Sequence, residues 1–154
     1  MVSACQNDVR LPIVPAVEVR PAAKPALEVI GGVEPVYFLP LSAPIEARID
    51  TGAETSSVGV TNMRTFERDG EKWVGFDING AHFEKRVRRK VTIRRAEGNE
   101  QRVSVNMDVK IGGELINAEF TLADRSKFEY RGLIGRNILS GRFIVDSSLE
   151  HTLH

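Results

Sequence analysis

The sequence predicts an all-β domain that closes fully or partly into a barrel, with one or two short helices. Apolar and polar residues alternate at period two in the stretches 73–76, 87–93, 103–111 and 115–122. Glycine-containing turns separate these stretches, and Asn79-Gly80 carries the strongest two-residue hairpin signal. Helical periodicity is scarce, and only 62–66 and 137–140 suit short helices. A chain of hairpins of this kind favours a barrel.

The chain divides into a proline-rich beginning and one domain. All seven prolines lie within the first 44 of the 154 residues. Proline removes backbone donors and favours extended conformations, so residues 1–32 are predicted to form a flexible tether. Residues 33–150 are predicted to form the barrel, and residues 151–154 a C-terminal tail. With 42% hydrophobic residues, the domain can bury a core of ordinary size.

The start of the chain allows two interpretations of where the protein resides. Val2-Ser3-Ala4-Cys5 has the form of a bacterial lipobox, although the charged and apolar regions of a signal peptide are missing before it. A lipidated Cys5 would make this a periplasmic lipoprotein, anchored to the envelope only through its lipid. A free cysteine on the tether, in a cytoplasmic protein, is the alternative. As Cys5 is the only cysteine, no intrachain disulfide is expected.

Charge is balanced overall and concentrated locally. Lysine plus arginine and aspartate plus glutamate number 21 each, so neither nucleic acid nor an acidic surface is an obligatory partner. Residues 85–95 nevertheless hold seven cations. They form either the solvated face of a strand or a positive rim that favours acidic peptides. Aromatic residues that could stack on bases are absent from this run, so no nucleic-acid partner is predicted.

Two short motifs are predicted to form one site. The apolar stretch 45–49 leads into Asp50-Thr51-Gly52-Ala53, and a glycine after the aspartate permits a tight turn with the carboxylate at its mouth. Far downstream, Leu133-Ile134-Gly135 again delivers a glycine, followed by a helix-compatible run. A turn aspartate that satisfies only its own backbone is the alternative for Asp50.

These motifs resemble those of the retropepsin-like aspartic proteases. Residues 47–146 are similar to a bacterial single-domain retropepsin-like family that is often labelled an ATP-dependent zinc protease. The marks of this resemblance, besides the two motifs, are Trp73-Val74-Gly75-Phe76 and the stretches 86–95, 120–126 and 143–146. The resemblance implies a retropepsin-like acid-protease barrel.

The resemblance also implies the chemistry. Aspartic proteases use two carboxylates that share one proton, and this chain has one Asp-Thr-Gly. A homodimer that brings Asp50 of each subunit to a two-fold axis is therefore expected. Thr51 would reach across the interface, Gly52 would let the substrate backbone approach, and Ala53 and Gly135 would bind substrate. A hairpin within residues 70–95 is expected to cover it.

The resemblance gives three further residues a supporting role. Glu54 is expected to accept a bidentate pair from Arg136, with Asn137 beside it, so that the second motif is fixed beneath the first. An exposed Arg136 at the start of a helix is the alternative.

The residues of this chain support neither the zinc nor the ATP dependence that the label of that family names. The histidines are His82, His151 and His154, and no His-Glu-x-x-His or phosphate-binding glycine loop occurs. No metal and no cofactor are therefore predicted, and the last two histidines are expected to fray.

The function predicted is that of a homodimeric aspartic endopeptidase acting on peptides or proteins, acidic ones among them. The alternative is a non-catalytic peptide- or protein-binding module of the bacterial envelope that uses the same groove. A third candidate, an adaptor in an envelope complex, rests only on the tether and the lipobox.

Overall fold

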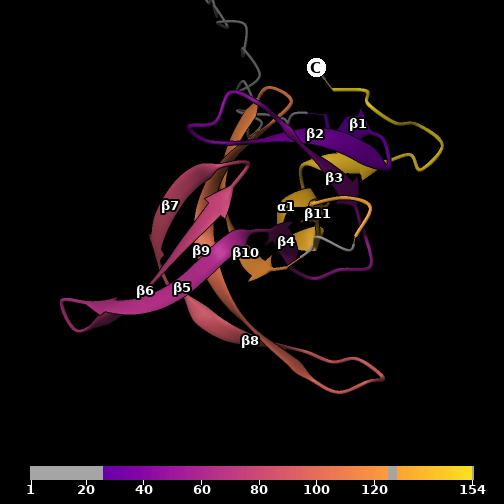
Figure 1. The fold of residues 1–154 in the computed structure, drawn as a ribbon. Coiled ribbons are helices and arrows are strands. Elements are labelled where there is room, and N and C mark those ends of the chain that lie inside the picture. The colour runs from indigo at the N-terminus through magenta and orange to yellow at the C-terminus, as the bar shows by residue number, and fades with distance from the viewer. Residues whose placement is uncertain (1–25, 125–127, 154) are drawn as a thin grey trace, which may run out of the picture.

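The computed structural model describes residues 26–124 and 128–153, which form three sheets and one short helix (Figure 1). The strands are β1 (Glu28–Ile30), β2 (Val33–Phe38), β3 (Ile45–Ile49), β4 (Ser56–Gly59), β5 (Thr61–Arg68), β6 (Glu71–Ile78), β7 (Ala81–Arg86), β8 (Arg89–Ile93), β9 (Glu100–Ile111), β10 (Glu114–Ala123), β11 (Gly132–Ile134) and β12 (Phe143–Val145), and the helix is α1 (Arg136–Leu139). In this part of the chain, no helix is long and apolar enough to span a membrane.

The largest sheet closes into a barrel, which confirms the predicted fold class. Its strand order is β10-β4-β11-β3-β2-β9-β8, and a further pairing of β10 with β9 closes the ring. Alternate residues of β3 and β9 are buried because successive side chains point to opposite faces of a strand. Inside, the rings of Phe38 and Phe120 meet edge to face at 5.1 Å, and both are fully buried.

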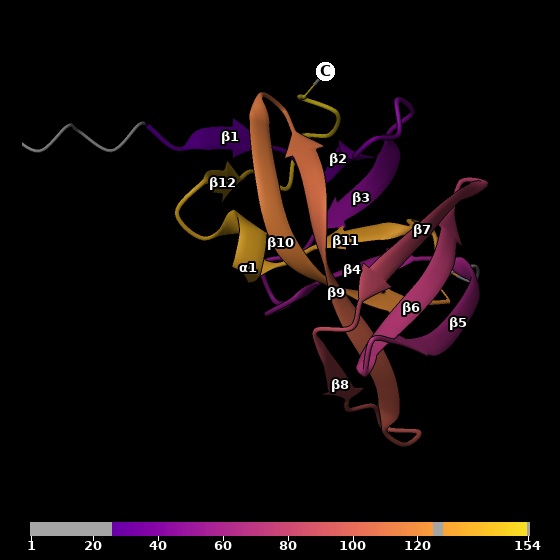
Figure 2. The same cartoon turned by 90° about the vertical axis from the view of Figure 1, so that its left-hand side faces the viewer.

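Strands β5, β6 and β7 form a separate antiparallel sheet beside the barrel (Figure 2). The predicted hairpin is confirmed: Asn79 and Gly80 join β6 to β7 with φ values of 49° and 81°. The prediction of a short helix at 62–66 is wrong, because these residues belong to β5, and residues 64–66 pair with β6 after an irregularity between Thr61 and Arg64. Val74, Phe76 and Ile78 of β6 are buried in the common core.

The two ends of the described chain pack together, so the domain extends beyond the predicted limits of 33 and 150. Strand β1 lies within the range predicted as a tether and pairs in parallel with β12. The predicted tail is also packed, since the His151 amide donates to the Val33 carbonyl and Leu153 is buried. Cys5 and most of the predicted tether lie outside the described residues.

A buried glutamate explains why the last residues are held. Glu34 is fully buried, and its carboxyl oxygens accept hydrogen bonds from the amides of Gly31, Thr152 and Leu153 at 2.6, 3.2 and 3.0 Å. The Thr152 hydroxyl donates a further bond at 2.5 Å. A single side chain therefore joins the start of the domain to its end.

Replacing Glu34 with alanine is expected to lower the free energy of unfolding by about 3 kcal/mol, because several buried donors lose their acceptor. Urea denaturation measures this change. Glu67→Ala, on the exposed face of β5, is the control and should change stability by less than about 0.5 kcal/mol. Equal effects of the two substitutions would show that Glu34 does not hold the C-terminal residues.

Candidate active site

Asp50 is fixed by the turn that follows β3. Its amide donates to the Ile134 carbonyl at 2.9 Å, and its Oδ1 accepts from the Gly52 amide at 2.9 Å. The Ala53 amide then donates to the Asp50 carbonyl at 3.2 Å, which closes the turn. Asp50 is half-buried, whereas Thr51 and Gly52 are exposed. The turn thus presents one oriented carboxylate at the protein surface.

The structure brings the two predicted motifs together. Strand β11 pairs in parallel with β3, so that Ile134 lies opposite Ile49 immediately before the two glycine-containing turns. The Arg136 amide donates to the Ala53 carbonyl at 2.8 Å, and the Asn137 amide donates to the Glu54 carbonyl at 3.0 Å. The start of α1 therefore lies directly beneath the Asp50 turn.

A second set of bonds, centred on Ser56, fastens the motifs from behind. The Asn137 Oδ1 accepts from both the amide and the hydroxyl of Ser56, at 3.0 and 2.7 Å. The Ser56 Oγ in turn accepts from the Gly135 amide at 2.9 Å, and Asn137 Nδ2 donates to the Glu119 carbonyl at 2.9 Å. Sequence reasoning identified Asn137 but missed Ser56; its place in the hydroxyl-rich run after Asp50 was the one available signal.

The predicted contact of Arg136 differs from the observed one. Instead of pairing with the Glu54 carboxylate, the guanidinium donates from Nη1 to the Thr51 carbonyl at 3.1 Å. The motifs are joined through backbone groups of residues 53 and 54, so the Glu54 side chain is not needed for the joint. Arg136 therefore still supports the turn, but through the Thr51 carbonyl and not through the Glu54 carboxylate.

A groove of about 410 Å³ lies beside the Asp50 turn. Its lining includes Ala53, Glu54 and Thr55 and, from the β8–β9 hairpin, Val91, Ile93, Arg95 and Arg102. Ala53, for which substrate binding was predicted, lines this groove. Gly135 is buried beneath the turn instead, where a Cβ atom would approach the Ala53 carbonyl oxygen at 2.8 Å.

The hairpin beside the groove is therefore not the one expected from the sequence. Residues 70–95 were predicted to cover the substrate, but β6 and β7 belong to the separate sheet, and of that range only Val91, Thr92, Ile93 and Arg95 line the groove. Figure 2 shows the β8–β9 hairpin extending from the end of the barrel opposite β1. The length of β9, which runs from the barrel into this hairpin, explains its position.

Most cations of the basic stretch have acidic partners. The Arg89 guanidinium binds the Glu119 carboxylate through two bonds of 2.7 and 2.8 Å, and it holds the pKa of Glu119 below its usual range. Arg86 pairs with Glu71. Arg95 and Arg102 both bind Glu100, whose pKa is lowered first by the hydrogen bond from Arg102. Only the last two arginines line the groove.

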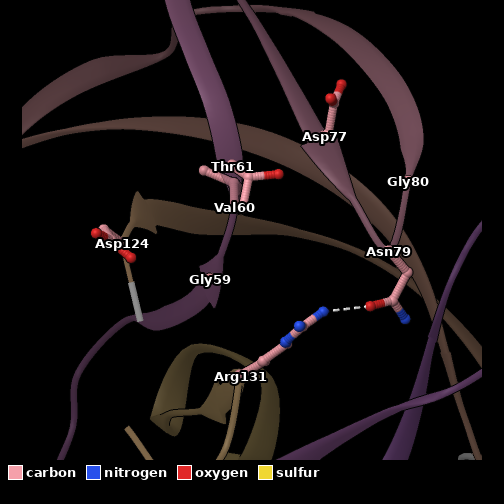
Figure 3. A pocket seen from close by; sticks show the side chains of 8 residues that line it. All are labelled: Gly59, Val60, Thr61, Asp77, Asn79, Gly80, Asp124 and Arg131. Carbon is pink, nitrogen blue, oxygen red and sulfur yellow. Dashed lines mark hydrogen bonds between the residues drawn. The ribbon is translucent and has the colours of Figure 1, made fainter. Parts of the chain in front are cut away.

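A second cavity, of about 460 Å³, lies between β4, β5 and the turn of the β6–β7 hairpin. Arg131, which lines it, points toward Asn79 and donates a hydrogen bond to the Asn79 side chain (Figure 3). Asp77, on another wall, accepts from Asn62 at 2.8 Å and contacts His82 Nδ1 at 2.8 Å. None of the residues predicted for the site lines this cavity.

The hydrogen bonds of His82 predict how the stability of the fold depends on pH. Asp77, and then Glu84, raise the pKa of His82 above its ordinary 6.5 through hydrogen bonds. The charged imidazole therefore stabilises the fold fully below pH 6.5, and this contribution is lost as the pH rises through the raised pKa. Asp77→Asn is expected to lower the His82 pKa in an NMR titration, whereas Glu71→Gln, in the same sheet, should leave it unchanged. An unchanged pKa in Asp77→Asn would contradict this account.

A closed barrel in which an Asp-Thr-Gly turn rests on a Gly-Arg-Asn helix start defines the class of retropepsin-like folds. The family model described as "RimB-like: Retropepsin-like aspartic endopeptidase RimB" matches residues 29–153, and the chain belongs to this family. In residues 26–124 and 128–153, no group of three or more histidine, cysteine or acidic side chains could hold a metal ion.

Similar proteins are named as ligases, whereas the description of the family model names an endopeptidase. A protein of Desulfotalea psychrophila named "Probable alpha-L-glutamate ligase" is 35% identical over 138 residues, which cover 83% of this chain and 30% of that protein. A protein of Shewanella halifaxensis with the same name is 37% identical over 130 residues, covering 78% and 28%. The chain thus spans less than a third of these relatives.

Among solved structures, the crystal structure of Lpg0085 from Legionella pneumophila, a protein with unknown function, is similar to this one. The TM-score is 0.70 at 26% identity, and the match covers 82% of this chain and 98% of the other. The match over nearly the whole of the other chain means that the two share this fold.

Proposed function

We propose that the chain is a homodimeric aspartic endopeptidase in which Asp50 of each subunit activates one water molecule. The observation that carries the proposal is the Asp50 turn: the carboxylate is oriented by the Gly52 amide, and its neighbours Thr51 and Gly52 are exposed. Membership of the retropepsin-like family supports the same chemistry. One subunit supplies half of the required pair of carboxylates.

In this mechanism the two Asp50 carboxylates share one proton. The ionised carboxylate takes a proton from water, which attacks the peptide carbonyl, while the protonated one donates a hydrogen bond to the carbonyl oxygen. Two like charges about 3 Å apart cannot both be ionised, so the pair titrates as a unit. Thr51 would join the two turns across the axis.

The terminal strands offer a surface for the second subunit. Val29 of β1 and Ile144 of β12 are paired neighbours, and these residues are 48% and 51% exposed. Strand β12 of this two-stranded sheet is the element after α1 in the chain, and α1 supports the Asp50 turn. Covering these apolar residues with their copies in a second subunit would stabilise a dimer next to the catalytic pair.

We further propose that the substrate is a peptide rich in glutamate. Two observations support this: the groove is lined by Arg95 and Arg102, and relatives that contain a similar domain are named glutamate ligases. A ligase that adds glutamate makes a product that this groove could receive. The charge of the groove and the name of the relatives thus suggest the same class of substrate.

Cleavage of two matched peptides, one with glutamates and one with glutamines, tests the proposal. The wild type should cleave the glutamate peptide faster between about pH 4 and 8, and its rate per subunit should rise with protein concentration until dimers are complete. If neither peptide is cleaved at any concentration while the glutamate peptide binds, the chain is instead the peptide-binding module considered as the alternative.

A further inference from the structure

Two arginine–glutamate pairs that involve the β8–β9 hairpin differ in geometry and burial: one joins β8 to β10, and the other lies within β9. Arg89 and Glu119 are joined at 2.7 and 2.8 Å, and the Glu119 side chain is only 10% exposed and also accepts from Ser104 at 2.6 Å. Arg102 and Glu100 are joined at 3.1 and 3.2 Å, and the Glu100 side chain is 40% exposed. Charged pairs of this kind usually lie at about 2.7–2.9 Å, so the second pair is the looser one.

Burial distinguishes the two partners of the loose pair. The Arg102 side chain is 8% exposed and lines the groove, whereas Glu100 reaches it from the hairpin surface. A buried guanidinium needs a counter-charge, because an unpaired buried charge is strongly unfavourable. An exposed carboxylate, by contrast, can return to water at little cost. Arg102 must have an acidic partner, but this partner need not be Glu100.

A second arginine completes the arrangement. Arg95 binds the same Glu100 carboxylate at 3.0 Å and also lines the groove. Glu100 and Arg102 are two residues apart in β9 and therefore lie on one face of the hairpin. Glu54 also lines the groove and would repel an acidic group, which favours binding of that group at the arginines.

We propose that Arg95 and Arg102 form a receptor for an acidic side chain of the bound peptide, and that Glu100 occupies this receptor in the free chain. The inference rests on the proposed function, in which a peptide with acidic side chains enters the groove. Glu100 acts as an internal competitor: a substrate carboxylate displaces it, and Glu100 turns toward water. A peptide without such a carboxylate leaves Glu100 in place and binds less well.

Binding of labelled peptides to the full chain carrying Asp50→Asn tests the proposal without cleavage. Glu100→Gln removes the competitor, and it is expected to tighten binding of the glutamate peptide about fivefold and to leave the glutamine peptide unchanged. Glu97→Gln, an equal change of charge in the turn of the same hairpin, is the matched control and should change neither affinity.

The receptor itself is tested by removing its cations. Arg95→Gln acts on a side chain that is 40% exposed, so the fold is retained, and it should weaken binding of the glutamate peptide about fivefold. Lys90→Gln, on the exposed part of β8, is its control. The proposal is overturned if Glu100→Gln weakens binding, or if it changes binding no more than Glu97→Gln does.

These outcomes distinguish a failure of the Arg95–Arg102 receptor from a failure of the proposed protease. If Glu100→Gln and Arg95→Gln shift binding as expected while the wild type cleaves nothing, the receptor stands and the protease fails. If the wild type cleaves but neither variant shifts binding selectively, the protease stands and the receptor is overturned.

Discussion

Asp50→Asn is expected to reduce the rate of peptide cleavage by at least about a thousandfold, because an amide can neither share a proton with the partner's carboxylate nor take one from water. Asparagine keeps an Oδ1 atom that can accept from the Gly52 amide, so the turn should survive. Initial rates with purified variants measure the effect.

The matched control is Asp108→Asn. The Asp108 carboxylate accepts a hydrogen bond from Asn117 on the exposed face of the β9–β10 hairpin, away from the Asp50 turn. This variant should retain the full rate. Cleavage by Asp50→Asn at a rate similar to that of Asp108→Asn would show that the Asp50 carboxylate takes no part in the mechanism.

The second large effect is expected for Gly135→Ala. A Cβ atom at this position would lie 2.8 Å from the Ala53 carbonyl oxygen and 2.9 Å from the Thr55 backbone. Backbone cannot move aside as a flexible side chain can, so the substitution should cost about 3 kcal/mol of stability. It should also slow cleavage, because the atoms displaced belong to the turn that holds Asp50.

Gly113→Ala provides the comparison, since nothing lies within 4 Å of the Cβ atom it would introduce. Thermal unfolding of the two variants measures the difference. A Gly135→Ala protein as stable as Gly113→Ala would mean that the second motif does not pack against the Asp50 turn as described.

The barrel and the meeting of the two motifs were predictable because their signals are local. Alternating apolar residues define β3 and β9, and the Asn79-Gly80 pair defines a hairpin. Both motifs place a glycine after an apolar strand. Parallel pairing of β3 with β11 then brings the two turns to one end of the barrel.

The features that were missed depend on contacts distant in sequence. Strand β1 has only three residues and pairs with β12 from the far end of the chain. Residues 62–66 have no decisive pattern of their own, and pairing with β6 makes them a strand. The partner of Arg136 and the burial of Arg102 are likewise set by the packed structure.

The most direct test of the shared catalytic pair is a mixing experiment. Wild-type and Asp50→Asn subunits are refolded together in different ratios at constant total concentration, and the cleavage rate is measured. If each dimer needs two Asp50 carboxylates, an equal mixture should retain about a quarter of the wild-type rate, because random pairing leaves that share of intact dimers. A rate of about half at the same ratio would mean that each subunit acts alone, and it would contradict the shared pair.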